Sequence, residues 1–538
     1  MARKSFHDRV EAPMPETFNA CEWLVDRQVR AGNAARTAVV AAAGRSLTYA
    51  ELSREVRRVA AGLAALGVRP EERVVLVMAD DVELLAGILG AMWLGAVPVP
   101  VSTMLTGGEL GPLLADSRAR LLLCSAEFAG RTATGAVPAA PELTDVVVDA
   151  DIPLDLPAEV TRRTWSDLLA AGEAYSGGAG VPMYPTWADS PALWLYTSGT
   201  TGTPKAAMHR HGSIRSVAEC YAAGVLGITA DDRCLSVPKL FFAYGLGNSA
   251  FFPLAVGATA LLERGRPTPE SIGARVAADA PTLFFAVPTF YAALLASGLP
   301  ADTFASVRLA VSAGEPLPPV IYQRFADRFG VQVLDGIGST EALHIFLSNR
   351  AGAVHPGSSG TPVPGYDVEI RDESGAAIDK PDVPGGLFVR GPSLASGYWC
   401  RAETTQRVFC GEWLRTGDTY VRNDDGTMSC LGRSDDMIKA AGIWVSPAEV
   451  EARLLEHPAV AEAAVVAVPD ADGLDKPVAC VVFRPGQRAE GTELVEFCLV
   501  TLAPFKRPRQ VVEVAALPKT ATGKLRRHVV REQLAAGG

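Results

Sequence analysis

The sequence predicts an α/β fold: a large N-terminal domain of parallel αβ sheets with a small β-barrel-like subdomain, followed by a small α+β C-terminal domain. Three observations support this prediction. Strand-like and helix-like segments alternate in the first part of the chain, glycine and proline become dense around 357–428, and the pattern changes again after Asp435. A chain of 538 residues is also too long for one hydrophobic core, so at least two domains are expected.

The alternation begins with a helix at Thr48. Thr48 and Glu51 have capping-box spacing, apolar residues follow on one helical face, and Gly67 stands where a C-terminal cap belongs. The pattern continues with a strand at 73–78, a helix through Leu94, and strands at 97–101 and 120–124. This spacing predicts right-handed βαβ units, in which helices cover both faces of a parallel sheet.

The second half of the chain predicts a different architecture. Short strand-like runs between glycines and prolines indicate hairpins in a β-rich subdomain at about 350–430. Farther on, Ser446 and Glu449 form another capping-box pattern, with Pro447 at the first helical position. The later elements are expected as strands at 460–468 and 478–483, a helix near 492–502, a strand at 510–514 and a final basic helix. We therefore expect domains at 1–434 and 435–538.

Composition argues against several classes of protein. The formal net charge of −10 argues against nucleic acid as the main partner. The nine cysteines include no C-x-x-C pair and the seven histidines show no H-E-x-x-H spacing, so neither structural zinc nor a disulfide framework is expected. The apolar stretch 84–105 contains glycines and prolines, which favours a buried helix and strand over a membrane span. Without a signal-peptide pattern, a cytoplasmic protein is expected.

The most specific signal is the segment Tyr196–Lys205, Tyr-Thr-Ser-Gly-Thr-Thr-Gly-Thr-Pro-Lys. Glycines let backbone N–H groups approach an anion, hydroxyls add donors, and the lysine adds charge. Pro204 directly precedes the lysine, so the order differs from a Walker A loop. A flexible polar loop is the alternative interpretation. The candidate phosphate-binding residues are Thr197, Ser198, Gly199, Thr200, Thr201, Gly202 and Lys205.

Together with later motifs, this segment resembles the signature of the adenylate-forming superfamily of acyl-CoA synthetases, adenylation domains and luciferases. The resemblance runs nearly the whole length of the chain. It implies ATP as a substrate: Thr340 would contact phosphate, Glu341 would hold Mg²⁺, and Asp418 would bind the ribose hydroxyls with help from Arg433. Ser312–Pro316 and Asp335–Gly336 resemble adenine-pocket segments, which assigns to the nucleotide Gly314, Glu315, Pro316, Asp335 and Gly336.

The resemblance also implies a mobile C-terminal domain. Lys524, in Pro518–Lys524, would reach into the active site and bond both the carboxylate of the acid and the phosphate, where negative charge gathers during adenylation. Rotation about a hinge at Asp435 would then replace Lys524 with the segment 439–444. There Lys439 would contact the phosphate of AMP, while Gly442 and Trp444 would border a tunnel for the pantetheine arm of CoA.

Within the superfamily, the chain is most similar to the benzoate–CoA ligase group, in the segments Lys239–Asn248 and Ala342–Phe346. In that group the aryl pocket is lined at the positions of Ala243, Tyr244, Ala313, Gly338, His344 and Ile345. Small residues would form a flat slot, the tyrosine would bound it, and the isoleucine would add apolar contact. His344 would lie beside the carboxylate of the substrate.

We therefore expect an ATP-dependent aryl-acid–CoA ligase acting in two steps, with benzoate or a hydroxy- or aminobenzoate such as salicylate as the acid. Its partners would be the aromatic acid, ATP, Mg²⁺ and CoA, with no nucleic acid and no membrane; a homodimer is left open. One alternative is a stand-alone aryl adenylation enzyme that loads a carrier protein, although no carrier domain follows on this chain. Another is a non-catalytic AMP-binding protein, which would not need both lysines and the metal-binding carboxylate.

Overall fold

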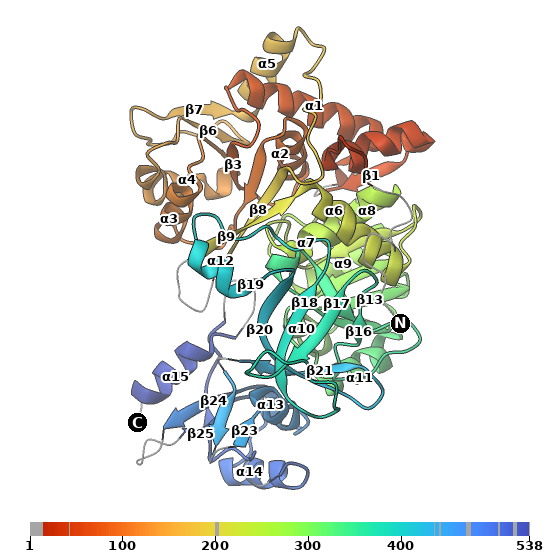
Figure 1. Ribbon diagram of the computed structural model, residues 1–538, viewed down its shortest axis with the longest axis vertical. Helices are drawn as coiled ribbons and strands as arrows, with labels where there is room; N and C mark the ends of the chain where they lie inside the picture. Colours follow the sequence, from red (N-terminus) through yellow and green to blue (C-terminus); the bar gives the residue numbers. More distant parts are fainter. Residues whose placement is uncertain are drawn as a thin grey trace.

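The computed structural model describes residues 14–41, 44–198, 204–434, 436–440, 443–469, 475–503, 506–519 and 525–536. Figure 1 shows two αβ regions in the upper and middle parts of the molecule, an antiparallel sheet beside the second region, and a smaller group of elements below that ends in α15 (Arg527–Ala536). The predicted α/β fold class is confirmed, because the strands of the large part form mainly parallel sheets.

The first sheet has five parallel strands in the order β4-β3-β5-β6-β7. The strands are β3 (Arg73–Val77), β4 (Val97–Pro100), β5 (Leu121–Cys124), β6 (Asp145–Val148) and β7 (Thr161–Thr164). The helices of this region are α1 (Tyr49–Ala65), α2 (Val82–Trp93), α3 (Gly107–Ser117), α4 (Ala126–Gly135) and α5 (Trp165–Ser176). Thr48 and Glu51 form the predicted capping box at the start of α1. The three strands predicted here therefore form as parallel neighbours.

Helix α2 explains the apolar stretch seen in the sequence. Every residue of the helix except Glu83 is buried, and β4, which follows it, is buried along its whole length. Within the described ranges, no helix is long and apolar enough to cross a membrane.

The second sheet has nine strands in the order β16-β15-β14-β13-β12-β10-β11-β1-β2. Its parallel part consists of β1 (Thr37–Val40), β10 (Arg233–Ser236), β11 (Thr259–Leu261), β12 (Leu283–Ala286), β13 (Leu309–Ser312) and β14 (Val333–Gly338). Antiparallel strands close the two ends: β2 (Ser46–Thr48), β15 (Ile345–Ser348) and β16 (Thr361–Pro362). Three predicted site segments follow β10, β13 and β14, at the carboxyl ends where open parallel sheets bind ligands.

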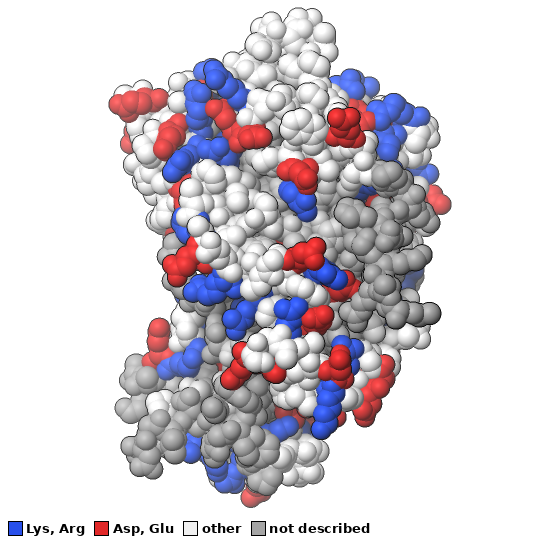
Figure 2. All heavy atoms as spheres, in the orientation of Figure 1, with Lys and Arg blue, Asp and Glu red and all other residues white. Residues whose placement is uncertain are grey.

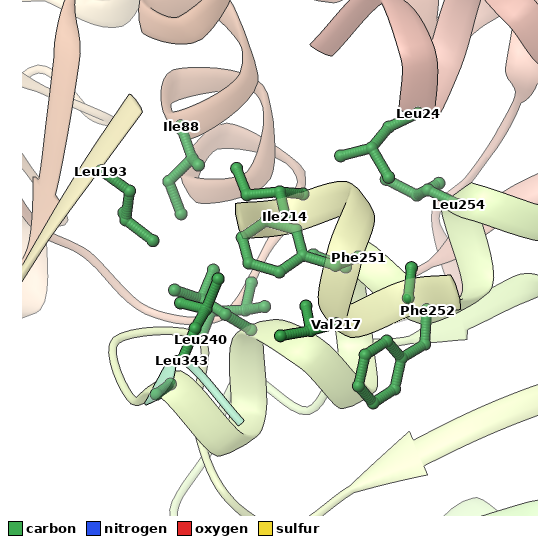
Figure 3. Close-up of a cluster of buried hydrophobic side chains, with 14 of the residues drawn as sticks. Leu24, Ile88, Leu193, Ile214, Val217, Leu240, Phe251, Phe252, Leu254 and Leu343 are labelled. Carbon is green, nitrogen blue, oxygen red and sulfur yellow. The ribbon is translucent and has the colours of Figure 1, made fainter. Parts of the chain in front are cut away.

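Helices and short helical turns connect and cover this sheet. They are α6 (His211–Val217), α7 (Ala243–Leu246), α8 (Phe252–Val256), α9 (Pro269–Asp279), α10 (Pro288–Ala296) and α11 (Pro319–Phe329). Figure 3 shows part of the core between them, where Leu240 lies close to Leu343, and Phe251 and Phe252 extend from the start of α8 and the residue before it. Burying a side chain of this size stabilises the fold by about 1.5–3 kcal/mol. This core joins two segments that the sequence assigns to the aryl pocket.

The glycine- and proline-rich region forms an antiparallel sheet, as predicted. Its strands are β17 (Asp367–Arg371), β18 (Gly385–Arg390), β19 (Phe409–Cys410), β20 (Trp413–Arg422) and β21 (Met428–Arg433), with α12 (Ala402–Val408) before β19. A separate hairpin of β8 (Pro191–Ser198) and β9 (Pro204–Arg210) leads into α6.

The C-terminal elements have hydrophobic clusters of their own. They are β22 (Ile438–Ala440), β23 (Ile443–Val445), α13 (Pro447–Leu455), β24 (Val460–Pro469), β25 (Asp475–Phe483), α14 (Gly491–Leu499), β26 (Gln510–Glu513) and α15. Ser446 caps α13 by accepting the Glu449 N–H at 3.2 Å. Among the described residues, the Glu449 carboxylate does not complete the predicted capping box and instead accepts from Lys506 Nζ at 2.7 Å.

His211, the first residue of α6, is fully buried. Its Nδ1 accepts the backbone N–H of Ala20 at 3.0 Å, and its Nε2 is buried without a partner among the described residues. Burial lowers the pKa of His211 to about 3. The imidazole is therefore neutral in the folded protein across the physiological range.

Replacing this ring should reduce the acid sensitivity of the fold. Between pH 6.5 and about 3 the unfolded chain protonates His211 and the folded protein does not, so wild-type stability falls as pH drops through this window. His211→Asn should remove about 2 kcal/mol of that loss between pH 7 and pH 5, because the amide keeps an acceptor but does not titrate. Urea unfolding from pH 7 to pH 5 measures this slope. Substitution of exposed His355 is the control, and equal slopes for His211→Asn and wild type would contradict the assignment.

Candidate active site

Lys and Arg residues are interspersed with Asp and Glu residues on the face seen in Figure 2. No single-sign field covers that face, so an anion bound there must be held by individual residues. Lys205, the cation predicted to hold phosphate, is the second residue of β9. The hairpin register places Thr197 opposite Lys205 and Ser198 opposite Pro204. Gly199, Thr200, Thr201 and Gly202 lie outside the described residues, as does the side chain of Ser198.

Glu341 and Lys205 are linked by Tyr398, a residue to which the motifs assigned no role. Tyr398 donates its hydroxyl to Glu341 Oε1 at 2.6 Å, and the Lys205 Nζ lies 4.5 Å from the centroid of the same ring. Burial lowers the pKa of Lys205, while the Glu341 carboxylate opposes that shift. Lys205, near the start of β9, and the Glu341 carboxylate therefore contact the same tyrosine.

Thr340 and Glu341 lie in a 3₁₀ turn, Thr340–Ala342, directly after β14. Buried His209 of β9 has its Nε2 2.8 Å from the Thr340 carbonyl, and burial lowers the pKa of His209 to about 4. Leu343 follows with φ of +66°, which a leucine rarely adopts. The turn is thus hydrogen-bonded to β9 at Thr340 and followed by a strained backbone conformation at Leu343.

The predicted ribose residues face each other across adjacent strands. Asp418 of β20 is paired in register with Arg433 of β21, and their side chains form an ion pair at 3.1 Å. Arg433 Nη1 also donates to the Thr416 carbonyl at 3.0 Å. The guanidinium therefore steadies the carboxylate expected to accept from both ribose hydroxyls.

Asp335 is the buried member of the predicted adenine segments. Its Oδ2 accepts the Leu317 N–H at 3.3 Å, and its Oδ1 is buried without a partner among the described residues. Burial raises the pKa of Asp335 to about 8. Gly336 beside it is buried as well, whereas Gly314 and Pro316 are exposed. An unpaired buried oxygen is suited to a donor such as the amino group of adenine.

Glu315, assigned to the same pocket from the sequence, faces the C-terminal elements. Its Oε1 accepts the backbone N–H of Leu525 at 3.2 Å. Lys524 lies outside the described residues, but this contact places its immediate neighbour against the large part of the chain. We call the contact between Glu315 and Leu525 the carboxylate latch.

The start of α15 is held by a half-buried arginine. Arg527 Nη2 donates to Glu451 Oε2 at 2.9 Å, and Arg527 also lies 3.7 Å from Asp436 Oδ2. Arg531 reaches the other Asp436 oxygen at 3.2 Å. On the opposite side, the Ser434 N–H bonds to the Gly417 carbonyl at 2.9 Å. The Asp436 side chain thus contacts α15, while its backbone N–H donates to the Arg433 carbonyl at 3.0 Å across the expected hinge.

The hinge residue Asp435 and the tunnel residue Gly442 lie outside the described residues. The backbones of Lys439 and Trp444 are paired across the hairpin of β22 and β23, but their side chains are not among those described. The geometry therefore gives no test of the expected CoA contacts.

The predicted aryl-pocket residues converge around His344. Its ring centroid lies 4.5 Å from that of Phe252, 5.2 Å from Tyr221 and 5.4 Å from Tyr244. Tyr244 donates its hydroxyl to the Val311 carbonyl at 3.1 Å. Ala243, Ala313 and Ile345 are buried in the same core cluster.

Two glycines allow the backbone to approach His344. A Cβ at Gly247 would lie 2.3 Å from the His344 ring, and one at Gly338 would lie 2.5 Å from the His344 carbonyl oxygen. Larger residues at either position would displace the histidine. Gly338, predicted to line the pocket, therefore also sets the path of the backbone.

His344 is neutral and oriented by a residue to which the sequence analysis gave no role. Burial lowers the pKa of His344 to about 3. Its Nε2 lies 3.2 Å from Asn248 Oδ1 and donates to that oxygen in the tautomer that carries the ring proton on Nε2. Asn248 was visible as the last residue of the segment Lys239–Asn248, but no local pattern linked it to a histidine 96 residues away. Tyr398 and His209 likewise gave no motif signal.

A family model described as AMP-binding enzyme matches residues 25–399, and one described as AMP-binding enzyme C-terminal domain matches residues 449–524. The chain belongs to the AMP-binding enzyme family. This membership confirms the resemblance inferred from the motifs.

Several members of the AMP-binding enzyme family are similar to the chain over nearly its whole length. Benzoate–CoA ligase of Thauera aromatica is 44% identical over 525 residues, 96% of each chain. The 4-hydroxybenzoate–CoA/benzoate–CoA ligase of Rhodopseudomonas palustris is 41% identical, over 97% of this chain and 95% of the relative. The crystal structure of a benzoate CoA ligase from Burkholderia xenovorans LB400 is 43% identical with a TM-score of 0.86, covering 96% of this chain and all of the other. The crystal structure of an anthranilate CoA ligase in complex with anthranoyl-AMP is 35% identical with a TM-score of 0.91. The match covers 99% of this chain and all of the other.

The carboxylate latch can be tested without an activity assay. Glu315→Ala should speed hydrogen exchange of the Leu525 amide about tenfold, the effect of losing a hydrogen bond to a charged group of roughly 1.5 kcal/mol. Glu315→Gln keeps an acceptor, so its rate of exchange at the Leu525 amide should lie between those of Glu315→Ala and wild type. Exchange in β24 and β25 should not change. Glu373→Ala, on the surface, is the control, and unchanged Leu525 exchange in Glu315→Ala would rule out the latch in solution.

Proposed function

We propose that this protein is an ATP-dependent aryl-acid–CoA ligase, which first converts an aromatic acid and ATP to acyl-AMP and pyrophosphate and then transfers the acyl group to CoA, releasing AMP. One observation carries the proposal. The segment Thr340–Ile345 places Glu341 beside Tyr398 and Lys205, and three residues later places neutral His344 among aromatic rings. The nucleotide end and the aryl end that we propose would therefore adjoin.

The acid that we propose is benzoate or a hydroxy- or aminobenzoate. Relatives with these names include the benzoate and hydroxybenzoate ligases, a 3-hydroxybenzoate–CoA ligase that is 37% identical, and an anthranilate–CoA ligase that is 34% identical. Ala243, Tyr244 and Ile345 are small, aromatic or apolar, and a lining of this kind would suit a flat ring better than a long acyl chain. Salicylate is included, because Tyr244 and His344 carry polar atoms that can meet a ring substituent.

In the first step, we assign charge stabilisation to Lys205 and Lys524. Lys205 would hold the departing phosphates together with the hydroxyls of the loop that precedes it, while Lys524 would bond the attacking carboxylate and the α-phosphate. His344 adds no charge beside the acid because it is neutral. Asp418, supported by Arg433, would fix the ribose, and Asp335 would face the adenine.

Mg²⁺ fits a site with one protein carboxylate. Within the described part of the chain, no group of three or more His, Cys, Asp or Glu residues could enclose a metal. Mg²⁺ is commonly held by one or two carboxylates together with phosphate oxygens and water. Glu341, with one oxygen bonded to Tyr398, suits that role. When bound, the ion neutralises charge on the phosphates.

For the second step, we infer that the C-terminal domain turns about Asp435. Lys439 would then approach the phosphate of AMP, and Gly442 and Trp444 would admit the pantetheine arm. All proposed residues lie on one chain, so a homodimer is not required for the chemistry. We place the reaction in the cytoplasm, where ATP and CoA are available.

The direct test combines the protein with MgATP, benzoate and CoA, without any carrier protein. Acyl-CoA, AMP and pyrophosphate should form together and depend on the acid. A panel of benzoate, salicylate, 2-aminobenzoate and 3- and 4-hydroxybenzoate ranks the substituents. If acyl-AMP forms and no acyl-CoA follows, the protein is the alternative, an adenylation enzyme that loads a carrier protein. Absence of pyrophosphate with every acid would refute adenylation altogether.

Replacing Lys524 should separate the two steps. Lys524→Ala should slow acyl-AMP formation by about 10²–10³, the usual cost of losing one donor to developing negative charge. The rate of transfer from supplied benzoyl-AMP to CoA should change much less, because rotation of the C-terminal domain would already have moved Lys524 away from the active site. Single-turnover assays measure both steps. Lys519→Ala, which removes a neighbouring lysine paired with Glu462, is the control, and equal losses in both steps would contradict domain rotation.

Replacing Tyr244 should change the choice of acid. Tyr244→Ala opens space beside His344, so kcat/KM for benzoate should fall by at least about tenfold relative to a bulkier ring acid, while KM for ATP changes less than about threefold. Tyr291→Phe is the control. Tyr291 is fully buried and donates its hydroxyl to the same Val311 carbonyl at 2.8 Å, but it is not among the predicted pocket residues. A larger effect on ATP than on the acid would remove Tyr244 from the aryl pocket.

A further inference from the structure

Tyr398 lies between two segments with predicted phosphate contacts. Its backbone bridges Ala207 of β9, and Ala395, three residues earlier, donates its N–H to the Glu341 carbonyl at 2.8 Å. The Tyr398 N–H is bonded to Thr405 Oγ1 at 3.0 Å. The residue is only 4% exposed, so its surroundings fix the direction of the side chain.

The hydroxyl of Tyr398 points at Glu341. The O–H···O distance of 2.6 Å is that of a charge-assisted hydrogen bond. Burial, reinforced by the Glu341 carboxylate, raises the pKa of Tyr398, so the phenol keeps its proton and acts as the donor. The bond uses Oε1 of the carboxylate and leaves Oε2 for a hard cation.

The ring face of the same side chain meets Lys205. At 4.5 Å from the centroid, the ammonium makes a cation–π contact that offsets part of its lost hydration. No direct ion pair between Lys205 and Glu341 is present in the described ranges, although the carboxylate acts on the lysine electrostatically. Each group instead contacts the phenol of Tyr398, so neither charge is neutralised by the other at contact distance.

We propose that Tyr398 is a positioning residue for MgATP: its hydroxyl fixes the metal-binding carboxylate of Glu341, and its ring face fixes the ammonium of Lys205. One side chain thereby sets the spacing between the metal and the lysine on the nucleotide phosphates. This inference rests on the proposed function, and it concerns the nucleotide rather than the acid.

Calorimetric titration with ATP, with and without Mg²⁺, tests the two contacts separately. Tyr398→Phe removes only the hydroxyl, so Kd for MgATP should rise about tenfold while Kd for metal-free ATP changes less than about twofold. Tyr398→Leu also removes the ring face, so metal-free ATP should bind about threefold more weakly as well. The Mg²⁺ concentration needed for half-maximal pyrophosphate release should rise in both variants.

Two controls separate positioning from general damage. Tyr366→Phe removes another buried phenol, whose hydroxyl lies 2.5 Å from Ser393 Oγ, and should leave both Kd values unchanged. In a Glu341→Gln background, Tyr398→Phe should have no further effect on Mg²⁺ dependence, because the two residues would act as one unit.

The outcomes distinguish this inference from the proposed function. Equal weakening of ATP and MgATP by Tyr398→Phe, no weakening, or full additivity with Glu341→Gln would overturn the positioning role. A wild-type protein that binds MgATP but releases no pyrophosphate with any acid would overturn the proposed function, and the calorimetric comparison would still decide the role of Tyr398. A wild-type protein that does not bind MgATP would overturn both.

Discussion

The left-handed backbone at Leu343 is the constraint on which the candidate active site depends. A φ of +66° costs a residue of this kind about 1–3 kcal/mol, and it persists because the leucine side chain is fully buried in the main core. The turn lets Glu341 face Tyr398 while His344, three residues later, packs among aromatic rings. Without it, the polar and aromatic ends of the site could not adjoin within so short a segment.

The electrostatics of the two ends differ sharply. At the aromatic end, His344 is neutral, and its environment consists of rings and small apolar residues. At the nucleotide end, Lys205, Glu341, Asp418 and Arg433 supply formal charges. A carboxylate attached to a ring would therefore lie at the boundary, with its apolar part in the slot and its charge directed to the cations. This arrangement favours attack by the carboxylate without the protein itself forming a covalent bond to the acid.

Local patterns predicted local structure well. The capping box at Thr48, the cap at Ser446 and the parallel alternation of the first sheet depend on neighbours in the sequence, and each forms as expected, apart from the reciprocal bond at Glu449. Contacts between distant residues were different. Tyr398 meets Glu341 across 57 positions, and Glu315 meets Leu525 across 210, so no spacing rule could reveal either contact. The motifs predicted which residues belong to the site, and only the fold shows which of the described side chains contact one another.

The carboxylate latch would bear on any rotation of the C-terminal elements. A single hydrogen bond to a charged group contributes about 1.5–3 kcal/mol, so losing this one would shift the ratio of docked to undocked molecules by roughly 10- to 150-fold. The latch acts together with other contacts between the same two parts, such as that of Ser446 Oγ with the Leu431 carbonyl. The proposed rotation about Asp435 would have to break the latch, and a variant without it should spend more of its time undocked.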